Sequence, residues 1–144
     1  MIKKLTRISD NDLDTISQIW LEANLDAHDF IPPTYWQERQ DQVKELLPEA
    51  SLFLAYHQSE IIGFLGLMDS YIAGIFVKKA YTSQGFGKAL LEAAKNESND
   101  LSLSVYQKNA PARQFYLKHG FEIQKEALDE ETNELELEMT WRHV

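Results

Sequence analysis

The stretch IFVKKAYTSQGFGKALL, residues 75–91, joins an apolar run to a turn with two glycines and then to a second apolar pattern. The first part predicts a strand that ends at Val77, and the apolar residues from Phe86 onward recur at helical spacing. Glycines such as Gly85 and Gly87 let the backbone before a helix approach an anion and direct several N–H groups towards it. The stretch therefore predicts a strand–turn–helix unit whose turn can bind an anion.

Two well-known phosphate motifs do not fit this turn. A Walker A loop needs a glycine where the chain has Thr82, and a serine or threonine where it has Ala89. A dinucleotide-binding fingerprint needs a third glycine where the chain has Leu90. A turn that only connects a strand to a helix is the alternative interpretation.

Capping signals place further helices on both sides of this unit. Ser9 and Asn109 are typical N-cap residues, and Gly120 is suited to end a helix. Thr34, with Gln37 three residues on, begins another helix. The expected helices follow residues 9, 34, 85 and 109, and the expected strands lie at 3–8, 52–56, 61–67, 71–77, 101–105 and 135–141, with one more strand before the last of these.

The resulting order, β-α-α-β-β-β-α-β-α-β-β, is typical of a mixed α/β fold. The unit from Tyr71 to Val105 should pair its two strands in parallel, because a helix connects them. Hairpins on either side make the rest of the sheet largely antiparallel. At 144 residues with no repeat or linker, the chain is expected to form one domain, residues 1–144.

The charge is unevenly distributed along the chain. The net charge is −9, which argues against a nucleic-acid partner, since such proteins need a basic surface. Residues 70–120 nevertheless hold seven basic and only three acidic residues. Lys78, Lys79 and Lys88 lie close to the glycine turn. This segment is either an anion-binding region between acidic flanks that attract a cationic ligand, or a solvated surface with uneven composition.

Several classes of protein are excluded by composition. The chain has no cysteine, so a disulfide framework, a thiolate metal site and a covalent cysteine intermediate are all ruled out. Its four histidines lack metal-ligand spacing, and we expect no metal site. No apolar run approaches the roughly 20 residues that a membrane span needs, and no signal peptide follows the basic N-terminus. We therefore expect a cytoplasmic protein without a membrane partner.

Residues 75–91 resemble the acetyl-CoA-binding motif of the GNAT family of N-acetyltransferases, in which Arg/Gln-x-x-Gly-x-Gly/Ala follows a strand and enters a helix. Residues 105–121, VYQKNAPARQFYLKHGF, resemble the second conserved block of that family, Asn-x-x-Ala-x-x-Phe-Tyr followed by Gly-Phe. The expected order of elements also matches the family fold, so the resemblance covers nearly the whole chain. Residues 28–31 and 35–36 are similar to small bacterial members described as peptidyl-lysine or general amine acetyltransferases.

This resemblance implies a parallel pair of strands that splays at the cofactor site, with acetyl-CoA as cosubstrate. A bulge or splay near Val77 would leave backbone groups free for the pantetheine arm. The resemblance further implies a general acid, Tyr116, beside the CoA sulfur. Without it, Tyr116 is a half-buried aromatic on a helix face shared with Ala112 and Phe115. The implied cofactor-binding residues are Ile75, Phe76, Val77, Thr82, Ser83, Gln84, Gly85, Phe86, Gly87, Lys88, Asn109 and Ala112.

One position departs from the family pattern. Thr82 stands where the family usually has Arg or Gln, so one side-chain contact to the cofactor is lost. The N–H groups from Gln84 to Lys88 are still expected to hold the pyrophosphate.

The acceptor side is less well defined by the sequence. Removing a proton from a lysine-like amine at pH 7 costs roughly 4–5 kcal/mol, and no general base is identified. Each candidate could instead be a cap, a loop residue, a solvated charge or, for the tryptophan, helix packing. The candidates for acceptor binding are Glu22, His28, Asp29, Trp36 and Asp69.

The resulting hypothesis is an enzyme that transfers acetyl from acetyl-CoA directly to a primary amine in a ternary complex. The acceptor is a protein lysine or a small cationic amine such as a polyamine or aminoglycoside. The rival hypothesis is a non-catalytic acyl-CoA-binding or regulatory module, which the retained Tyr116 disfavours and Thr82 slightly favours. A monomer or a homodimer would fit either hypothesis.

Overall fold

The computed structural model describes residues 1–5 and 7–143. The expected order of elements is confirmed, although the first strand is shorter than the predicted 3–8 and Thr6 lies outside the described residues. The elements are β1 (Ile2–Leu5), α1 (Asp10–Ala27), α2 (Pro33–Leu46), η1 (Leu47–Glu49), β2 (Ser51–His57), β3 (Glu60–Met68), β4 (Tyr71–Val77), η2 (Lys79–Tyr81), α3 (Phe86–Glu97), β5 (Asp100–Tyr106), α4 (Ala110–Lys118), β6 (Glu122–Asp129) and β7 (Glu134–Arg142).

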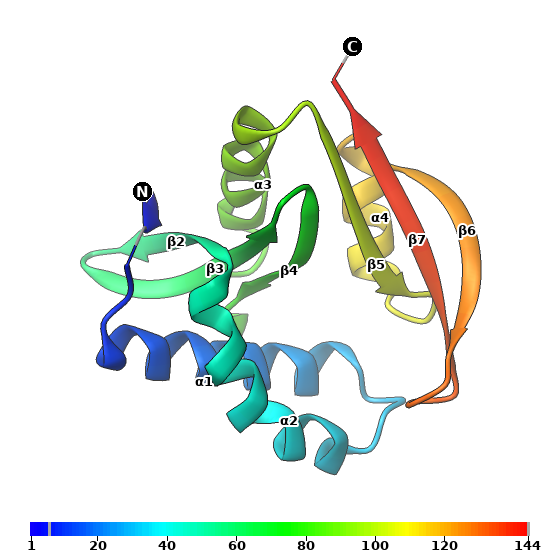
Figure 1. The fold of residues 1–144 in the computed structure, drawn as a ribbon, viewed down its shortest axis with the longest axis horizontal. Helices are drawn as coiled ribbons and strands as arrows, with labels where there is room; N and C mark the ends of the chain where they lie inside the picture. Colours follow the sequence, from blue (N-terminus) through cyan, green and yellow to red (C-terminus); the bar gives the residue numbers. More distant parts are fainter. Residues whose placement is uncertain (6, 144) are drawn as a thin grey trace.

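The strands of the described residues form one seven-stranded sheet in the order β1-β2-β3-β4-β5-β7-β6. Neighbouring strands are antiparallel except β4 and β5, which are parallel because α3 connects them as a crossover. The predicted mixed sheet with one parallel pair is therefore confirmed (Figure 1). Within the described part of the chain, no helix combines the length and the apolar character needed to cross a membrane.

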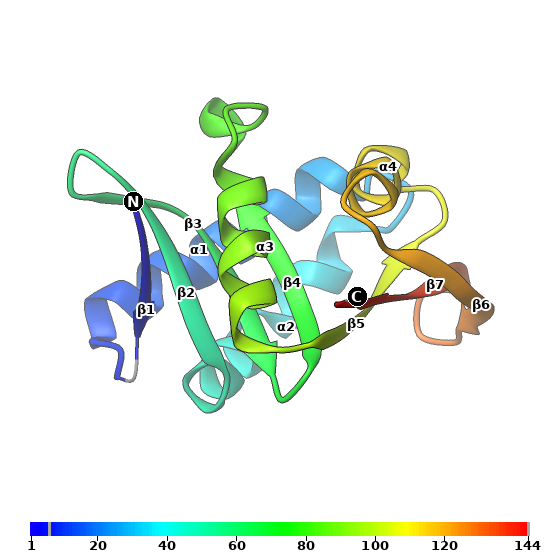
Figure 2. The ribbon, with the colours of Figure 1, turned by 90° about the horizontal axis from the view of Figure 1, so that it is seen from above.

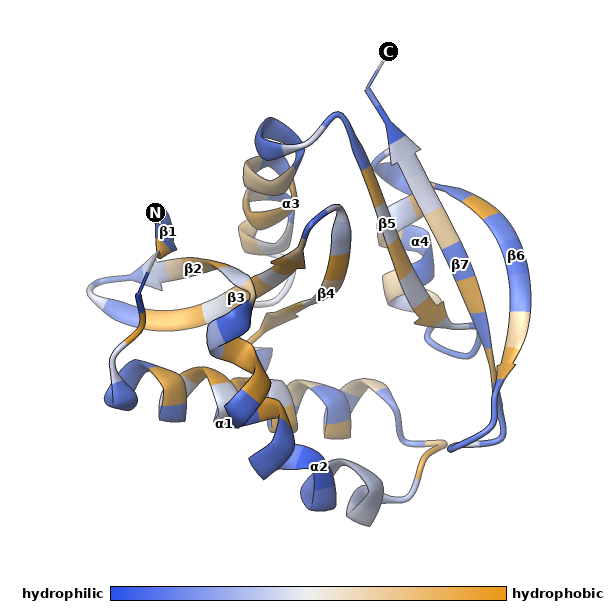
Figure 3. Cartoon of the chain, viewed as in Figure 1, coloured by the Kyte–Doolittle hydropathy of each residue, from blue (hydrophilic) through white to orange (hydrophobic). Residues whose placement is uncertain are grey.

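The sheet separates two layers of helices. Successive side chains of a strand point to opposite faces, so Leu52 and Leu54 of β2 pack with α1 and α2, whereas Phe53 and Ala55 pack with α3. Figure 2 shows α3 on one side of the sheet and α1 and α2 on the other. Figure 3 shows why β4 lies in the middle of the sheet, since it is hydrophobic along most of its length, while hydrophilic residues dominate the edge strand β6.

Two of the expected helix caps are confirmed and one is wrong. The Ser9 hydroxyl accepts a hydrogen bond from the Asp12 N–H at 3.1 Å, which begins α1, and Asn109 caps α4 in the same way. The second helix begins at Pro33 rather than at a Thr34 cap, and its N-cap residue makes no side-chain hydrogen bond. Proline at the first helical position has no N–H to satisfy and its φ already suits a helix, so a capping side chain is unnecessary there.

The strands β4 and β5 are paired over very little of their length. Within the described residues they pair at Tyr71 opposite Ser102, where the Ser102 N–H donates to the Ser70 carbonyl at 2.9 Å. Beyond that point the two strands diverge (Figure 1). The expected splay is therefore present, and it leaves backbone groups of both strands without strand partners.

A bulge in β4 lies just after this paired point. Gly66 of β3 faces Gly74, but the next residue, Leu67, faces Ile72, so Ala73 is an extra residue in β4. A bulge bends its strand and increases the local twist, which directs the rest of β4 away from β5. The sequence placed a bulge or splay near Val77, and the bulge lies four residues earlier.

Gly120, which follows α4, provides a test of how this helix ends. Its φ is +93°, and a Cβ there would lie 3.2 Å from Cδ1 of Trp141. Gly120→Ala should lower the free energy of unfolding by about 1–2 kcal/mol, the cost of a left-handed conformation in an L-residue. Urea unfolding would measure the loss. The matched control is Gly66→Ala, whose Cβ would meet atoms only at 3.7 Å or beyond and which should change stability little. Equal losses in the two variants would contradict this account of the helix end.

Candidate active site

The opening between β4 and β5 exposes a row of backbone hydrogen-bonding groups. The Lys78 N–H donates to the Ile62 carbonyl at 2.8 Å, which sets the alternation along β4. Because hydrogen-bonded and non-hydrogen-bonded pairs alternate in an antiparallel ladder, Ile75 and Val77 direct their N–H and C=O groups away from β3 and towards the opening. These two residues can therefore bind an extended, amide-containing ligand as a further strand would be bound.

Phe76 requires a correction. The sequence grouped its backbone with those of its neighbours as a cofactor contact, but the same alternation pairs its N–H and C=O with Phe64 of β3. Its ring lies over Gly74, where a Cβ would come within 2.4 Å of ring atoms. Phe76 therefore shapes the strand by packing and offers no backbone group to the opening.

The glycine turn leaves the first N–H groups of α3 accessible. Gly85 is the N-cap residue with φ +90°, and the first intrahelical hydrogen bond runs from the Ala89 N–H to the Gly85 carbonyl at 3.0 Å. The N–H groups before Ala89 have no partner inside the helix, as at any helix start. Ser83 also has a left-handed φ of 64°, which curves the turn around this point. The geometry fits an anion at the N-terminus of α3.

The polar side chains of the turn bond to the turn itself. The Thr82 hydroxyl donates to the Lys79 carbonyl at 2.9 Å, and the Gln84 amide donates to the Ala80 carbonyl at 3.1 Å. Thr82 therefore stabilises the loop, whereas an arginine at this position would extend beyond it. The Thr82 hydroxyl is thus used within the loop, and the N–H groups at the start of α3 stay accessible.

The three lysines around the turn differ in their partners. Lys78 forms an ion pair with Glu60 at 2.7 Å, so its charge is largely compensated. Lys79 and Lys88 form no ion pair among residues 1–5 and 7–143. The positive charge available to an anion at this turn is thus carried by Lys79 and Lys88.

Tyr116 lies in the second turn of α4 and is only 8% exposed. Burial raises the pKa of its hydroxyl, and Tyr71 acts in the same direction. The Tyr116 ring belongs to the core cluster that includes Leu103 and Val105 of β5, the strand on one side of the opening. The neighbouring Phe115 covers the start of α3, with its ring 3.6 Å from where a Gly87 Cβ would be. The structure thereby brings the glycine turn and the tyrosine helix together.

Asn109 and Ala112 have structural partners of their own. The Asn109 Oδ1 accepts from the Ala112 N–H at 3.3 Å, and its Nδ2 lies 3.1 Å from Nε2 of His28. Both ends of the Asn109 amide are therefore engaged in the described structure. His28, an acceptor candidate from sequence, packs between Trp36 and Tyr106 with ring centroids 5.1 Å from each.

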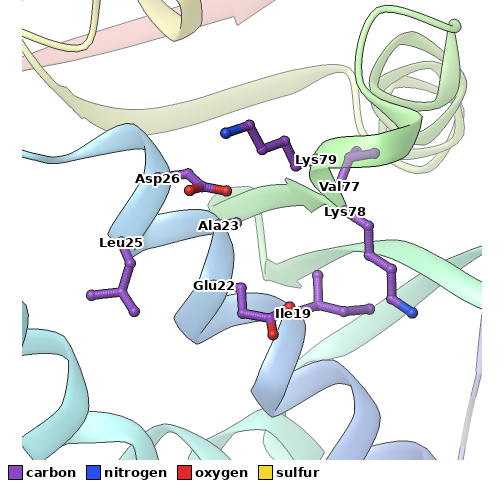
Figure 4. Close-up of a pocket in the computed structure, with 8 residues that line it drawn as sticks. All are labelled: Ile19, Glu22, Ala23, Leu25, Asp26, Val77, Lys78 and Lys79. Carbon is purple, nitrogen blue, oxygen red and sulfur yellow. The ribbon is translucent and has the colours of Figure 1, made fainter.

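A cavity of about 300 Å³ lies between the second half of α1 and the end of β4. Figure 4 shows Glu22 and Asp26, one helical turn apart on α1, at this cavity together with Val77 and Lys79. Lys78 also lines this cavity, so its two carboxylates are accompanied by two lysines beside the opening between β4 and β5. Glu22 was among the expected acceptor residues, whereas Asp26 was not, although its spacing of four residues on the same helix was a usable signal.

The other acceptor candidates do not gather at this cavity. Asp29 is exposed in the segment after α1, and Asp69 lies in the turn before β4, at the opposite end of that strand from Val77. Trp36 is 7% exposed and packs edge-on against Trp20 at 5.8 Å. Its role is therefore helix packing in the α1–α2 core.

A polar contact that sequence reasoning missed joins α2 to the turn between β6 and β7. The Tyr35 hydroxyl donates to Glu131 at 3.1 Å, and Arg39 lies 3.7 Å from the same carboxylate. Nearby, the Tyr106 hydroxyl donates to Asp129 at 2.7 Å. The first two contacts hold α2 against the turn between β6 and β7, and the third joins the end of β5 to the end of β6. Figure 1 shows the C-terminal hairpin reaching the segment between α1 and α2.

Comparison with known proteins agrees with this arrangement. Residues 48–123, which include the opening, the glycine turn and the tyrosine helix, match the acetyltransferase (GNAT) domain. The chain belongs to the GNAT family of acetyltransferases. It is 32% identical over 143 residues to the peptidyl-lysine N-acetyltransferase YiaC of Escherichia coli strain K12, an alignment that covers 98% of this chain and 96% of that one.

Solved structures of GNAT-like proteins have the same fold. The solution structure of apo YjaB from Escherichia coli superposes with a TM-score of 0.85 at 25% identity, covering 100% of this chain and 99% of that one. The PaiA N-acetyltransferase of Thermoplasma acidophilum, crystallised with coenzyme A, superposes with a TM-score of 0.80 at 21% identity over 99% of each chain. The mixed sheet with its single parallel pair is therefore the GNAT fold.

Proposed function

We propose that this GNAT enzyme transfers an acetyl group from acetyl-CoA to the side-chain amine of a lysine in a protein or peptide, by direct transfer in a ternary complex. Acetyl-CoA is the cosubstrate, and it supplies the activated acetyl group as a thioester. The observation that carries the proposal is the opening between β4 and β5, with backbone donors on the β4 side and Tyr116 in the core cluster that contains residues of β5. We assign this function to residues 1–144 as one domain.

The residues present fit the parts of such a cofactor. A pantetheine arm carries amide groups, and Ile75 and Val77 offer backbone partners for amides along the opening. A pyrophosphate needs N–H donors and positive charge, which the N-terminus of α3 and Lys88 provide. Ser83, Gln84 and Phe86 would contribute through the backbone of the turn rather than through their side chains.

Tyr116 would act as the general acid. Because burial raises the pKa of its hydroxyl, the group keeps its proton at neutral pH and can donate it to a departing thiolate. The chain has no cysteine, so an acetyl-cysteine intermediate is excluded and direct transfer is the simplest chemistry.

The two carboxylates of the cavity, which Lys78 and Lys79 also line, support a cationic acceptor. Glu22 and Asp26 face the end of β4, where a protonated lysine side chain would approach the opening from the α1 side. The curated relatives YiaC and YjaB are named peptidyl-lysine N-acetyltransferases, and their identity to this chain is about 30%. That name favours a lysine in a protein over a small polyamine, which the cavity would also accept.

The deciding measurement is release of CoA thiol from acetyl-CoA with lysine peptides, N-terminal peptides and small polyamines, combined with mass spectrometry of the peptide products. We expect acetylation on lysine side chains with the highest turnover. Turnover only with polyamines would replace the protein acceptor, and tight binding of acetyl-CoA without any turnover would favour a non-catalytic module. A cytoplasmic location and a monomeric or homodimeric state stay predictions.

The first prediction for this function concerns the glycine turn. Acetyl-CoA at one hundred times its dissociation constant should stabilise the wild type by about 2.7 kcal/mol. Gly87→Glu should abolish most of this stabilisation, because it adds a side chain and a negative charge at the N-terminus of α3. Asn96→Glu is the control, since it adds the same charge on the same helix at an exposed position near the other end. Thermal unfolding with and without acetyl-CoA gives the comparison. If the two variants responded alike, the cofactor site would have to lie elsewhere.

The second prediction concerns the tyrosine. Tyr116→Phe removes only the hydroxyl, so turnover should fall by roughly 10²–10⁴-fold while acetyl-CoA affinity stays within a few-fold. Steady-state thiol release and cofactor titration would be measured on both proteins. Tyr56→Phe, which removes a hydroxyl on β2, should leave both quantities unchanged. Unchanged turnover in Tyr116→Phe would remove this residue from the chemistry.

The third prediction concerns the acceptor. Glu22→Gln and Asp26→Asn should each raise KM for a lysine peptide by about 1.4- to fivefold, because exposed charge pairs contribute about 0.2–1 kcal/mol. The effect should shrink as salt increases, and kcat should change little. The control is Glu38→Gln together with Glu45→Gln on the exposed side of α2. An equal effect of the control pair would mean that the net charge of the protein, and not this cavity, attracts the acceptor.

A further inference from the structure

The contact between His28 and Asn109 connects the two sides of the sheet. His28 is the C-cap residue of α1, which covers one face, and Asn109 is the N-cap residue of α4, on the other side beside α3. The atoms His28 Nε2 and Asn109 Nδ2 are 3.1 Å apart, although 81 residues separate them in the chain. His28 packs against Tyr106, the last residue of β5, and Asn109 follows that strand by three residues.

The helix cap decides which way the Asn109 amide points. Its oxygen accepts the Ala112 N–H at 3.3 Å, a bond that an amide nitrogen could not accept. The nitrogen therefore faces His28 and donates, and Nε2 of His28 must accept with an unprotonated lone pair. This leaves the ring proton of a neutral His28 on Nδ1.

The surroundings of His28 favour the neutral ring as well. It is enclosed by Phe30, Trp36 and Tyr106, with ring centroids between 5.1 and 5.6 Å away. Burial lowers the pKa of His28 to about 4, while the Asn24 carbonyl acts in the opposite direction. That carbonyl does not reach hydrogen-bond geometry with Nδ1 in the described structure.

The charged groups around this site are engaged elsewhere. Asp129 accepts from the Tyr106 hydroxyl, whose own pKa is raised mainly by burial and then by this bond. Lys108, which lies 5.6 Å from the Phe30 ring, forms an ion pair with Glu134 at 3.0 Å. Asp29 is exposed in the following segment. None of these carboxylates is bonded to the His28 ring among the described residues, so none favours its protonation directly.

We infer that His28 is a positioning residue: as a neutral, Nδ1-protonated ring it accepts a hydrogen bond from Asn109 and holds the start of α4, and with it Tyr116, against the end of α1. The helix α4 has nine residues, and helices this short depend on their caps and on packing rather than on their own propensity. A hydrogen bond to the capping side chain restrains both the cap and the direction of the helix. Because its Nε2 lone pair is occupied, His28 has no free ring nitrogen with which to act as a general base.

The catalytic part of this inference rests on the proposed acetyl transfer, but its main test does not. Asn109→Asp keeps a good N-cap and replaces the amide donor by an oxygen that can only accept. His28 must then carry a proton on Nε2 to keep the contact.

NMR of the histidine rings across pH 3–8 should show wild-type His28 neutral and Nδ1-protonated above pH 5. In Asn109→Asp its pKa should rise by at least one unit, a tenfold gain in proton affinity, with Nε2 protonated. His119, which lies near Lys95 and Lys118, serves as an internal control and should keep its titration.

A second arm measures function. His28→Leu should lower kcat about tenfold or more with acetyl-CoA affinity within twofold, and His28→Gln, which retains an acceptor oxygen, should recover most of that loss. Wild-type His28 titrating above pH 5.5, or a ring unchanged in Asn109→Asp, would overturn the hydrogen-bond assignment. Equal kcat in His28→Leu and His28→Gln would overturn the positioning role. If the wild type transferred no acetyl group to any amine, the proposed function would fail, and the NMR arm would still decide the His28–Asn109 contact.

Discussion

The parting of β4 from β5 is the constraint on which the rest of the structure depends. In a continuous parallel pair, the N–H and C=O groups of Ile75, Val77 and their opposite numbers on β5 would bond to each other. In residues 1–5 and 7–143 the two strands are paired only at Tyr71 and Ser102, so hydrogen bonds that are each worth about 0.5–1.5 kcal/mol net are not formed. Such groups are tolerated only where water or a ligand can reach them. The opening therefore offers backbone groups to a ligand, and the extra residue Ala73 in β4 lies where the opening begins.

Contacts made by α1, α2 and α4 connect the elements on the two sides of the opening between β4 and β5. The second half of α1 runs from the end of β4, where Glu22 and Asp26 border the cavity, to the end of β5, where His28 meets Asn109. The helix α1 therefore spans the opening from the end of β4 to the end of β5. On the other side, Phe115 of α4 covers Gly87 at the start of α3, so the anion-binding turn and the tyrosine helix are packed as one surface. The contact of Tyr35 with Glu131 fastens α2 to the C-terminal hairpin in the same manner.

The parts of this arrangement that depend on neighbouring residues were predictable from sequence. The start and end of a helix depend on residues close by in the sequence, and the caps Ser9 and Asn109 and the helix end at Gly120 were located correctly. The strand at residues 135–141 was also located correctly. Thr34 failed because the two prolines before it already satisfy the geometry of a helix start. The local pattern singled out the glycine turn, whereas only the family resemblance singled out Tyr116.

The misses share a physical cause, since they are contacts between residues far apart in the chain. Phe76 was grouped with Ile75 and Val77 because a sequence shows three adjacent apolar residues, whereas a ladder alternates the direction of their backbone groups. The Tyr35–Glu131 contact spans 96 residues and depends on how the hairpin of β6 and β7 curves towards α2. The charge of Lys78 could not be discounted until the β2–β3 turn placed Glu60 beside it. A lysine in the sequence can therefore be assigned to a ligand only after its ion-pair partners in the fold are known.

The burial of Tyr116 affects how readily its hydroxyl could protonate a thiolate. A phenol has a reference pKa near 10 and a thiol near 8.5, so in water a tyrosine would protonate a thiolate at a cost of about 2 kcal/mol. Burial raises the pKa of Tyr116 further, which would enlarge this cost if the thiolate stayed in water. If the departing thiolate formed beside Tyr116, burial there would raise the pKa of the thiol for the same reason. Burial would then raise the proton affinity of the phenol and of the thiolate together, which would keep the proposed donor matched to its acceptor.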